Sequence, residues 1–252
     1  MQSEFKDKVV LITGAGSGIG KAAAMAYAER GAKVVVSDIH AENTNATAEA
    51  IKAVGGESLA IPTDVSSFEA VKELVDQTVT HYGSIDIALN NAGIGGQRER
   101  TSQFSLKSWD QVIAVNQSGV FYCMREQLRY MEQQGSGCIV NIASIAGLRA
   151  FPMQVAYSAS KFAVVGMTRT AAGEYAKMGI RINAVCPVFT HTPMVDGLLE
   201  IDQSLEAKLV KTIPMRRFGE VSDMVNAILW LSSEGSSFIT GLALPVDGGQ
   251  MM

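Results

Sequence analysis

This chain of 252 residues has few cysteines and no excess of basic residues. Three cysteines, Cys123, Cys138 and Cys186, lie far apart in apolar stretches, which predicts reduced thiols in a cytoplasmic protein and no disulfide framework. The three histidines lack metal-ligand spacing, so no metal site is expected. With 21 Lys and Arg against 25 Asp and Glu, the chain has no basic surplus with which to hold nucleic acid or an anionic membrane.

Long hydrophobic runs are also absent. No apolar stretch reaches the roughly 18 residues of a membrane span. The charged residues 1–8 lead directly into a strand pattern, which is unlike a secretory signal peptide. The protein is therefore expected to have no membrane partner.

What the sequence has instead is a regular alternation of strand and helix patterns. Short β-branched runs predict buried parallel strands at Lys8–Thr13, Lys33–Ser37, Ser58–Pro62, Ile85–Asn90, Cys138–Ile142, Arg181–Cys186 and Leu242–Val246. Helix patterns lie between them at Ile19–Arg30, Ala41–Val54, Ser67–Tyr82, Leu106–Met131, Val155–Met178 and Ser222–Ser232. The alternation predicts a single α/β domain over residues 1–252, with a doubly wound, mainly parallel seven-stranded sheet and helices on both faces.

One stretch breaks this alternation. From Pro187 to about Arg217 there is no strand pattern, and the helical pattern is patchy. A connection of that length inside a compact domain is more often a lid or a binding segment than a plain connector. We therefore expect a substrate lid at residues 187–217.

A glycine-rich turn follows the first strand and opens the first helix. The pattern T-G-x-x-x-G-x-G is met by Thr13, Gly14, Gly18 and Gly20. Glycines let the backbone turn sharply and approach a ligand, and a helix start offers free N–H groups and a positive dipole end to a pyrophosphate. The turn by itself is equally compatible with tight packing.

A carboxylate after the second strand strengthens the nucleotide interpretation. Asp38 lies 18 residues beyond Gly20, near the offset at which an acidic side chain meets the ribose hydroxyls of the adenosine. It would repel a 2′-phosphate, and Ser17 stands in the turn where a binder of NADP would often carry a base. NAD(H) is therefore predicted in preference to NADP(H).

Three further residues suggest proton transfer. Tyr157 and Lys161 are four apart on a predicted helix and so share one face. A neighbouring ammonium favours the phenolate and would lower the pKa of Tyr157, which suits a phenol that exchanges a proton with an alcohol oxygen. Ser144 follows the fifth predicted strand, and its hydroxyl could hydrogen-bond the substrate oxygen.

In this order the motifs resemble the short-chain dehydrogenase/reductase family over nearly the whole chain. The features that carry the resemblance are the glycine turn, Asp64-Val65, Asn90-Asn91-Ala92-Gly93, Asn116, Ser144, Tyr157, Lys161, Pro187…Thr192 and Val246-Asp247-Gly248-Gly249. The resemblance implies a Rossmann fold and an oxidoreductase that moves a hydride between NAD(H) and a ketone or secondary alcohol.

The resemblance also implies roles for individual residues. Tyr157 would be the acid/base, Ser144 would orient the carbonyl or hydroxyl, Lys161 would hold the nicotinamide ribose and lower the pKa of Tyr157, and Asn116 would anchor a water that relays protons to Lys161. The cofactor would be bound by Gly14, Ser17, Gly18, Ile19, Gly20, Asp38, Asp64, Val65, Asn90, Ala92, Gly93, Tyr157, Lys161, Pro187, Val188, Thr190 and Thr192.

The substrate pocket implied by the family layout is almost entirely apolar, which favours a hydrophobic or aryl carbonyl compound. Its residues would be Ile94, Ser144, Ala146, Leu148, Met153, Val188, Met194, Leu198 and Leu205. The family usually has Pro-Gly where this chain has Pro187-Val188, and we expect the valine to add bulk beside the nicotinamide and narrow the pocket.

Two other functions remain open from the sequence. One is reduction of 3-oxoacyl groups on an acyl carrier protein, which Arg125 and Arg129 favour and the uncharged segment Gln133–Gly137 disfavours. The other is a non-catalytic protein that binds and senses NAD. For either function, we predict an interface from the spare apolar surface of Leu106–Met131 and Val155–Met178 and from the apolar end Gly241–Met252. The resemblance implies that this interface forms a D2 homotetramer.

Overall fold

The computed structural model describes residues 4–201 and 205–252. Its centre is a seven-stranded sheet with the order β3-β2-β1-β4-β5-β6-β7, and every adjacent pair is parallel. The strands are β1 Val9–Thr13, β2 Lys33–Ser37, β3 Glu57–Ala60, β4 Ile87–Asn90, β5 Gly137–Ile142, β6 Ile180–Pro187 and β7 Ala243–Val246. All seven predicted strands are confirmed, with ends shifted by at most two residues.

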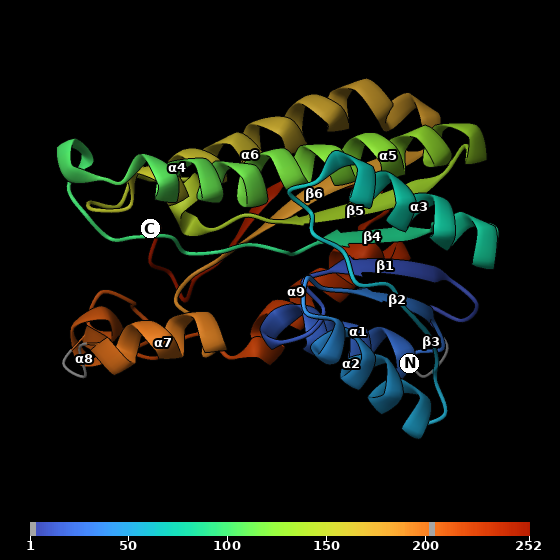
Figure 1. The fold of residues 1–252 in the computed structure, drawn as a ribbon, viewed down its shortest axis with the longest axis horizontal. Helices are drawn as coiled ribbons and strands as arrows, with labels where there is room; N and C mark the ends of the chain where they lie inside the picture. Colours follow the sequence, from blue (N-terminus) through green and yellow to red (C-terminus); the bar gives the residue numbers. More distant parts are fainter. Residues whose placement is uncertain (1–3, 202–204) are drawn as a thin grey trace.

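Helices cover both faces of this sheet (Figure 1). One layer holds α3 Phe68–Tyr82, α4 Leu106–Ile113, α5 Gly119–Gln134 and α6 Val155–Tyr175. The other layer holds α1 Gly18–Ala28, α2 Ala41–Ala53 and α9 Val221–Ser232. The doubly wound arrangement inferred from the alternating patterns is therefore confirmed.

Alternate strand residues supply the core on each side. Val10 and Ile12 of β1 belong to the apolar cluster under α1 and α9, and Leu11 belongs to the cluster under α3, α5 and α6. All three are fully buried. Both faces of the strands are apolar because both faces are covered.

The predicted helix Leu106–Met131 is interrupted in the structure. Residues Ala114–Ser118 form a π-helical segment between α4 and α5. Each π turn takes up an extra residue and rotates the side chains that follow. The apolar periodicity of the sequence could not reveal this interruption because the residues on both sides of it keep a helical pattern.

The segment 187–217 contains two short helices, α7 Pro193–Ile201 and α8 Leu205–Val210. They project beyond the sheet on the side where the chain also ends (Figure 1). Below them, Val188, Ile213 and Phe218 form a buried apolar cluster with Ile145. The segment is thus anchored to the main domain by packing.

The two edges of the sheet are β3 and β7. Leu242 and Val246 accept backbone hydrogen bonds from Ala184 of β6 and from Val188, which follows β6. Since alternate residues of a strand direct their backbone groups to opposite sides, Pro245 between them faces the open edge.

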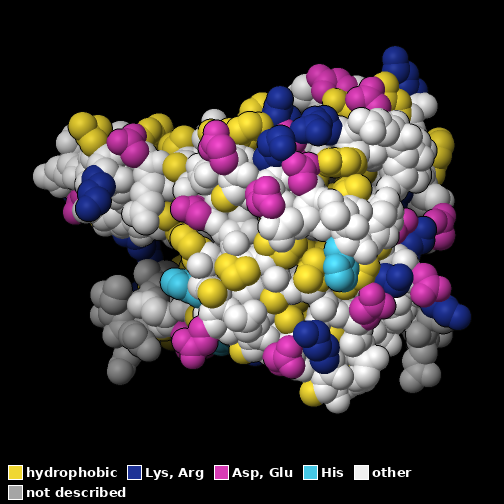
Figure 2. Space-filling view, turned by 45° about the vertical axis from the view of Figure 1, so that its right-hand side comes forward, with side chains coloured by type: hydrophobic (Ala, Val, Ile, Leu, Met, Phe, Trp, Pro, Cys, Tyr) yellow, Lys and Arg dark blue, Asp and Glu magenta, His cyan; other side chains and the backbone are white. Residues whose placement is uncertain are grey.

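Among the described residues, no helix is both long and apolar enough to cross a bilayer. On the face shown in Figure 2, Lys and Arg side chains are interspersed with Asp and Glu. This face therefore carries no field of a single sign.

Gly83 ends α3 in the left-handed conformation, with φ +83°, which glycine adopts without strain. We expect Gly83→Ala to lower the free energy of unfolding by about 1 kcal/mol, because an L side chain is strained there even though nothing lies within 4 Å. The matched control is Gly173→Ala, on an exposed turn inside α6, where alanine should stabilise by about 0.5–1 kcal/mol. Urea unfolding measures both changes in the free energy of unfolding. Changes of the same sign in the two variants would contradict the left-handed cap at Gly83.

Candidate active site

The glycine-rich turn lies between the end of β1 and the start of α1. Gly14 and Gly18 have positive φ values of 65° and 51°. A Cβ on Gly20 would lie 2.2 Å from the carbonyl oxygen of Gly14. The turn therefore requires glycine for its backbone conformation and for its packing, and no side chain of the described residues caps the amino end of α1.

Asn91 holds this turn from the neighbouring strand. Its Nδ2 donates to the carbonyl oxygens of Thr13 at 3.1 Å and Gly14 at 3.0 Å. Its backbone N–H donates to the Thr13 hydroxyl at 3.1 Å. The sequence analysis quoted Asn91 within the Asn90–Gly93 motif without giving it a role, and the structure assigns it the support of the turn.

Asp38 reaches the turn from the end of β2. Its Oδ2 accepts the Gly16 N–H at 3.0 Å, and its Oδ1 accepts the His40 N–H at 3.0 Å. A Cβ on Gly16 would stand 2.9 Å from this carboxyl group. The structure thus brings Asp38 and the glycine turn together, as the sequence predicted, whereas Ser17 lies exposed at the helix start with no side-chain cap bond.

Two other residues predicted on the adenosine side, Asp64 and Asn90, have different surroundings. Asp64 is half-buried, and its Oδ1 accepts from the N–H and hydroxyl of Ser66 at 2.9 and 2.7 Å. Asn90 is 1% exposed, and its side chain exchanges hydrogen bonds with Gln127 and Asn141 inside the core. The Asn90 amide therefore does not face the nucleotide site, and only its backbone remains available for the predicted contact.

Ser144, Tyr157 and Lys161 meet where β5 ends and α6 begins. The Lys161 Nζ donates to the carbonyl oxygen of Ile142 at 2.8 Å and lies 5.6 Å from the centre of the Tyr157 ring. The Ser144 hydroxyl lies near the Tyr157 phenol and acts to lower its pKa. The predicted constellation is therefore assembled at the carboxyl edge of the sheet, where ligands bind in doubly wound folds.

Asn116 joins this group from the π-helical segment. Its Oδ1 accepts the Ile94 N–H at 2.8 Å, and its Nδ2 donates to the Ile94 carbonyl at 2.9 Å. A Cβ on Gly93 would lie 3.3 Å from this Oδ1 and 3.7 Å from the Lys161 Nζ. The π turn directs the amide into the protein, and the absence of a side chain at Gly93 leaves room beside the lysine.

The electrostatics of the site differ from the sequence-based expectation in one respect. Burial raises the pKa of Tyr157, and the nearby Ser144 hydroxyl partly opposes this. Burial also lowers the pKa of Lys161 to about 8. The expectation that the Lys161 ammonium lowers the pKa of Tyr157 is therefore wrong for the protein alone, because desolvation outweighs a cation that points to the Ile142 carbonyl.

The residues predicted to line the substrate pocket differ widely in exposure. Ala146 and Val188 are buried, Ile94, Leu148 and Leu205 are half-buried, and Met153 and Met194 are 45% and 48% exposed. The side chain of Leu198 lies outside the described part of the structure. Val188 has no positive φ, so no glycine is needed for the backbone there and only the added bulk distinguishes it.

The segment that follows β6 reaches back to the glycine turn. The Thr190 hydroxyl donates to the Val188 carbonyl at 2.8 Å, and the Thr192 hydroxyl donates to the Thr190 carbonyl at 3.2 Å. A Cβ on Gly18 would lie 3.5 Å from the Thr192 methyl. The start of α7 and the start of α1 therefore border the same space, where cofactor contacts were predicted.

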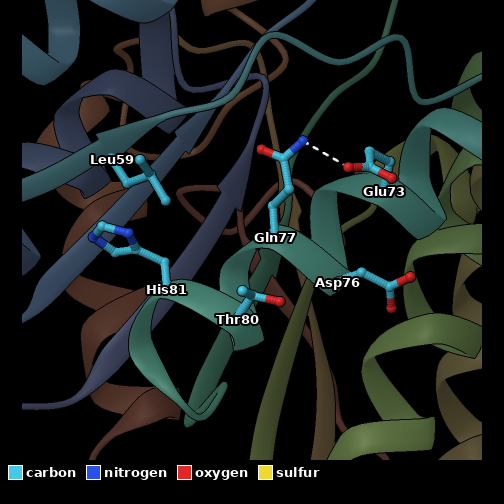
Figure 3. Close-up of a pocket in the computed structure, with 6 residues that line it drawn as sticks. All are labelled: Leu59, Glu73, Asp76, Gln77, Thr80 and His81. Atoms are coloured by element: carbon cyan, nitrogen blue, oxygen red, sulfur yellow. Dashed lines mark hydrogen bonds between the residues drawn. The ribbon is translucent and has the colours of Figure 1, made fainter.

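A separate hollow of about 450 Å³ lies between α3 and β3 (Figure 3). Gln77 donates to Glu73 at 2.8 Å on one of its sides, and Leu59 and His81 form another. It contains none of the predicted site residues. Within the described ranges, no group of three or more His, Cys, Asp or Glu side chains is arranged to hold a metal ion.

Comparison with known proteins agrees with this site. A family model described as Enoyl-(Acyl carrier protein) reductase matches residues 14–251. Levodione reductase from Leifsonia aquatica is 38% identical over 255 residues, covering 98% of this chain and 96% of that protein. The crystal structure of levodione reductase superimposes with a TM-score of 0.94, covering 98% of both chains. The chain belongs to the short-chain dehydrogenase/reductase family.

Two further relatives indicate the range of this family. Cyclohexanol dehydrogenase from an Acinetobacter species is 41% identical over 248 residues. The match covers 98% of the present chain and 96% of the cyclohexanol dehydrogenase. The structure of NAD+-bound xylitol dehydrogenase is 32% identical with a TM-score of 0.93, covering 98% of this chain and all of the other. The chain is accordingly an oxidoreductase of the alcohol and ketone class, as its motifs predicted.

The lowered pKa of Lys161 predicts how the stability of this dehydrogenase depends on pH. An unfolded chain keeps its lysine protons up to about pH 10.4, whereas folded Lys161 releases its proton near pH 8. The free energy of unfolding should therefore rise between pH 8 and pH 10, relative to Lys161→Met, by up to ~1.4 kcal/mol per pH unit.

Urea unfolding of both proteins at several pH values measures this difference. Lys177→Met, at an exposed lysine near the end of α6, controls for the loss of one positive charge. A difference between wild type and Lys161→Met that stays constant from pH 7 to pH 10 would contradict the prediction.

Proposed function

We propose that this dehydrogenase transfers a hydride between NAD(H) and a ketone or secondary alcohol with a hydrophobic or aryl body. The observation that carries the proposal is the meeting of Ser144, Tyr157 and Lys161 beside the glycine-rich turn. A bound nicotinamide supplies or accepts the hydride. The half-buried phenol of Tyr157 moves the proton to or from the substrate oxygen, and the Ser144 hydroxyl orients that oxygen.

The other two residues of the constellation support this proton transfer. Lys161 holds the nicotinamide ribose, and Asn116 anchors a water on the path to Lys161. Because the lysine has a pKa of about 8, it can release and recover a proton near neutral pH. The proton of Tyr157 is then exchanged through neighbouring groups, and no strongly acidic phenol is needed.

The residues around the turn fit a dinucleotide. The uncapped start of α1 suits a pyrophosphate, and Gly16 leaves a space beside Asp38 that a Cβ would fill. Ser37 adds a buried hydroxyl that has no partner among the described residues. The half-buried Asp38 carboxylate favours ribose hydroxyls over a 2′-phosphate, which supports NAD(H) over NADP(H).

The apolar residues around the constellation support a hydrophobic substrate. Ala146, Val188 and Ile94 offer no side-chain hydrogen-bond donor for a sugar or an acid. A relative of this chain is named for cyclohexanol, so cyclic ketones are the first compounds to assay. The helices α7 and α8 within residues 187–217 act as a lid over this pocket, and Val188 narrows it.

Reduction of 3-oxoacyl groups on a carrier protein has less support. The guanidinium groups of Arg125 and Arg129 both pair with Glu126, whose side chain is fully buried. Arg125 also lies over the Phe68 ring at 5.0 Å. These arginines are therefore engaged within the chain, and an acidic carrier would have to compete with a carboxylate already in place.

We propose a D2 homotetramer in the reducing environment of the cytoplasm. Phe121 of α5 and Phe162 of α6 are 50% and 45% exposed on the two helices that carry spare apolar surface. The free cysteines of the described chain are all buried, which suits reduced thiols. Light scattering tests the assembly, and a monomer at micromolar concentration would reject it.

We expect Tyr157→Phe to lower kcat for NADH-dependent ketone reduction by about 10²- to 10⁴-fold, because the phenolic proton is lost. The Kd for NADH, measured by fluorescence titration, should stay within about twofold of wild type because the ring remains. Tyr175→Phe, at the other end of α6, is the matched control and should keep full activity.

The assay compares cyclic, aryl and carrier-bound ketones. Preference for carrier-bound substrates would favour the acyl-carrier function over the one proposed. NADH binding without turnover of any ketone or alcohol would instead indicate an NAD-sensing protein, and the same result would be seen with Tyr157→Phe.

Asp38→Asn should raise the ratio of kcat/KM for NADPH to that for NADH at least about tenfold, which corresponds to ~1.4 kcal/mol. The amide keeps an acceptor for the Gly16 N–H but removes the charge that repels a 2′-phosphate. Glu42→Gln, an exposed carboxylate in the first turn of α2, should leave the ratio unchanged. A wild type that already prefers NADPH would overturn the role given to Asp38.

A further inference from the structure

A buried serine connects two of the residues in the catalytic constellation. The Ser160 hydroxyl donates to the backbone carbonyl of Tyr157 at 2.8 Å and accepts from the Asn116 Nδ2 at 3.3 Å. Ser160 and Asn116 are both fully buried. The hydroxyl therefore uses its proton and a lone pair within the protein.

Within the described residues, the Asn116 amide makes no other hydrogen bond to α6. Its remaining hydrogen bonds go to the N–H and carbonyl of Ile94, at 2.8 and 2.9 Å, in the loop after β4. The bond to Ser160 is the one that reaches α6. A continuous path of hydrogen bonds thus runs from the β4 loop through the π-helical segment to the first turn of α6.

The position of Ser160 in the sequence makes this path relevant to the chemistry. It directly precedes Lys161 and bonds the carbonyl of Tyr157 three residues earlier. The Lys161 side chain is independently fixed at its far end by the Ile142 carbonyl at 2.8 Å. A shift of Ser160 would therefore move the Tyr157 phenol together with the backbone of Lys161, while the Lys161 ammonium stays bound to the Ile142 carbonyl.

We propose that Ser160 is a positioning residue, which holds Tyr157 in register with Asn116 and the β4 loop. It touches neither substrate nor cofactor and acts through the Tyr157 backbone. The proposal rests on the proposed function insofar as Tyr157 is the proton donor there. Misplacement of a reacting group by a fraction of an ångström is enough to slow a reaction substantially without changing the binding of the partners.

A hydroxyl bonded back to a helix carbonyl is also a common structural feature, and α6 offers an internal comparison. The Thr168 hydroxyl donates to the Val164 carbonyl at 2.8 Å and accepts from the Asn141 Nδ2 at 2.9 Å. Thr168 is fully buried as well. It has the same chemistry on the same helix, about two turns beyond Ser160, and its amide partner is not part of the catalytic constellation.

The test compares Ser160→Ala with Thr168→Val. We expect Ser160→Ala to lower kcat about 10- to 100-fold while the Kd for NADH and the KM for ketone stay within about twofold. Thr168→Val should lower the melting temperature at least as much and keep kcat within about twofold of wild type. Equal effects of the two variants on kcat would overturn the proposal, because a merely structural hydroxyl would behave in that way.

A double variant tests whether Ser160 and Asn116 act as one unit. Asn116→Ala combined with Ser160→Ala should be no slower than Asn116→Ala alone, since both substitutions break the same path. Multiplicative losses in kcat would show that the two residues act separately, and that result would also overturn the proposal.

A readout without turnover separates this inference from the proposed function. The ring Cζ resonance of Tyr157 in ¹³C-tyrosine-labelled protein, assigned by its loss in Tyr157→Phe, should shift in Ser160→Ala and not in Thr168→Val. If wild type reduced no ketone, the proposed function would fail, and this resonance would still decide the role of Ser160. An unshifted resonance in Ser160→Ala would overturn the inference even in an active enzyme.

Discussion

The hydrogen bond from the Lys161 Nζ to the Ile142 carbonyl fixes the longest helix to the end of the central strand β5. Burying an ammonium costs free energy unless it is hydrogen-bonded, and the lowered pKa of Lys161 reflects that cost. The same contact holds the Lys161 amine, which can gain or lose a proton, at the carboxyl edge of the sheet. Ser144 and Tyr157 are placed relative to this one contact.

Buried amides make the other long-range connections. Asn90, Gln127 and Asn141 exchange hydrogen bonds across β4, β5 and α5, and Asn141 continues to Thr168 on α6. Asn91 secures the glycine turn. A satisfied polar network inside a core imposes geometry because each donor and acceptor has only one good arrangement. The apolar clusters supply the stability, Asn91 fixes the glycine turn of the site, and the other amides join strands and helices within the core.

Sequence patterns were sufficient for the sheet, its helical layers and the meeting of Ser144, Tyr157 and Lys161. Strand periodicity and glycine turns are local signals, and the spacing of Tyr157 and Lys161 is a property of any helix. The π-helical segment could not be predicted in this way, because it depends on the hydrogen bonds between Asn116 and the distant Ile94. The pKa of Tyr157 was predicted in the wrong direction for a similar reason: spacing shows that a cation is near, and only the packing shows how deeply the phenol is buried.

Pro245 affects how other extended segments can pair with the open edge of the sheet at β7. The open edge of a parallel sheet normally offers a row of N–H donors to any extended segment, and the proline removes one from the middle of a four-residue strand. A further strand on this side would therefore lack one ladder hydrogen bond. This gap in the ladder makes the β7 edge a poor template for edge-to-edge aggregation.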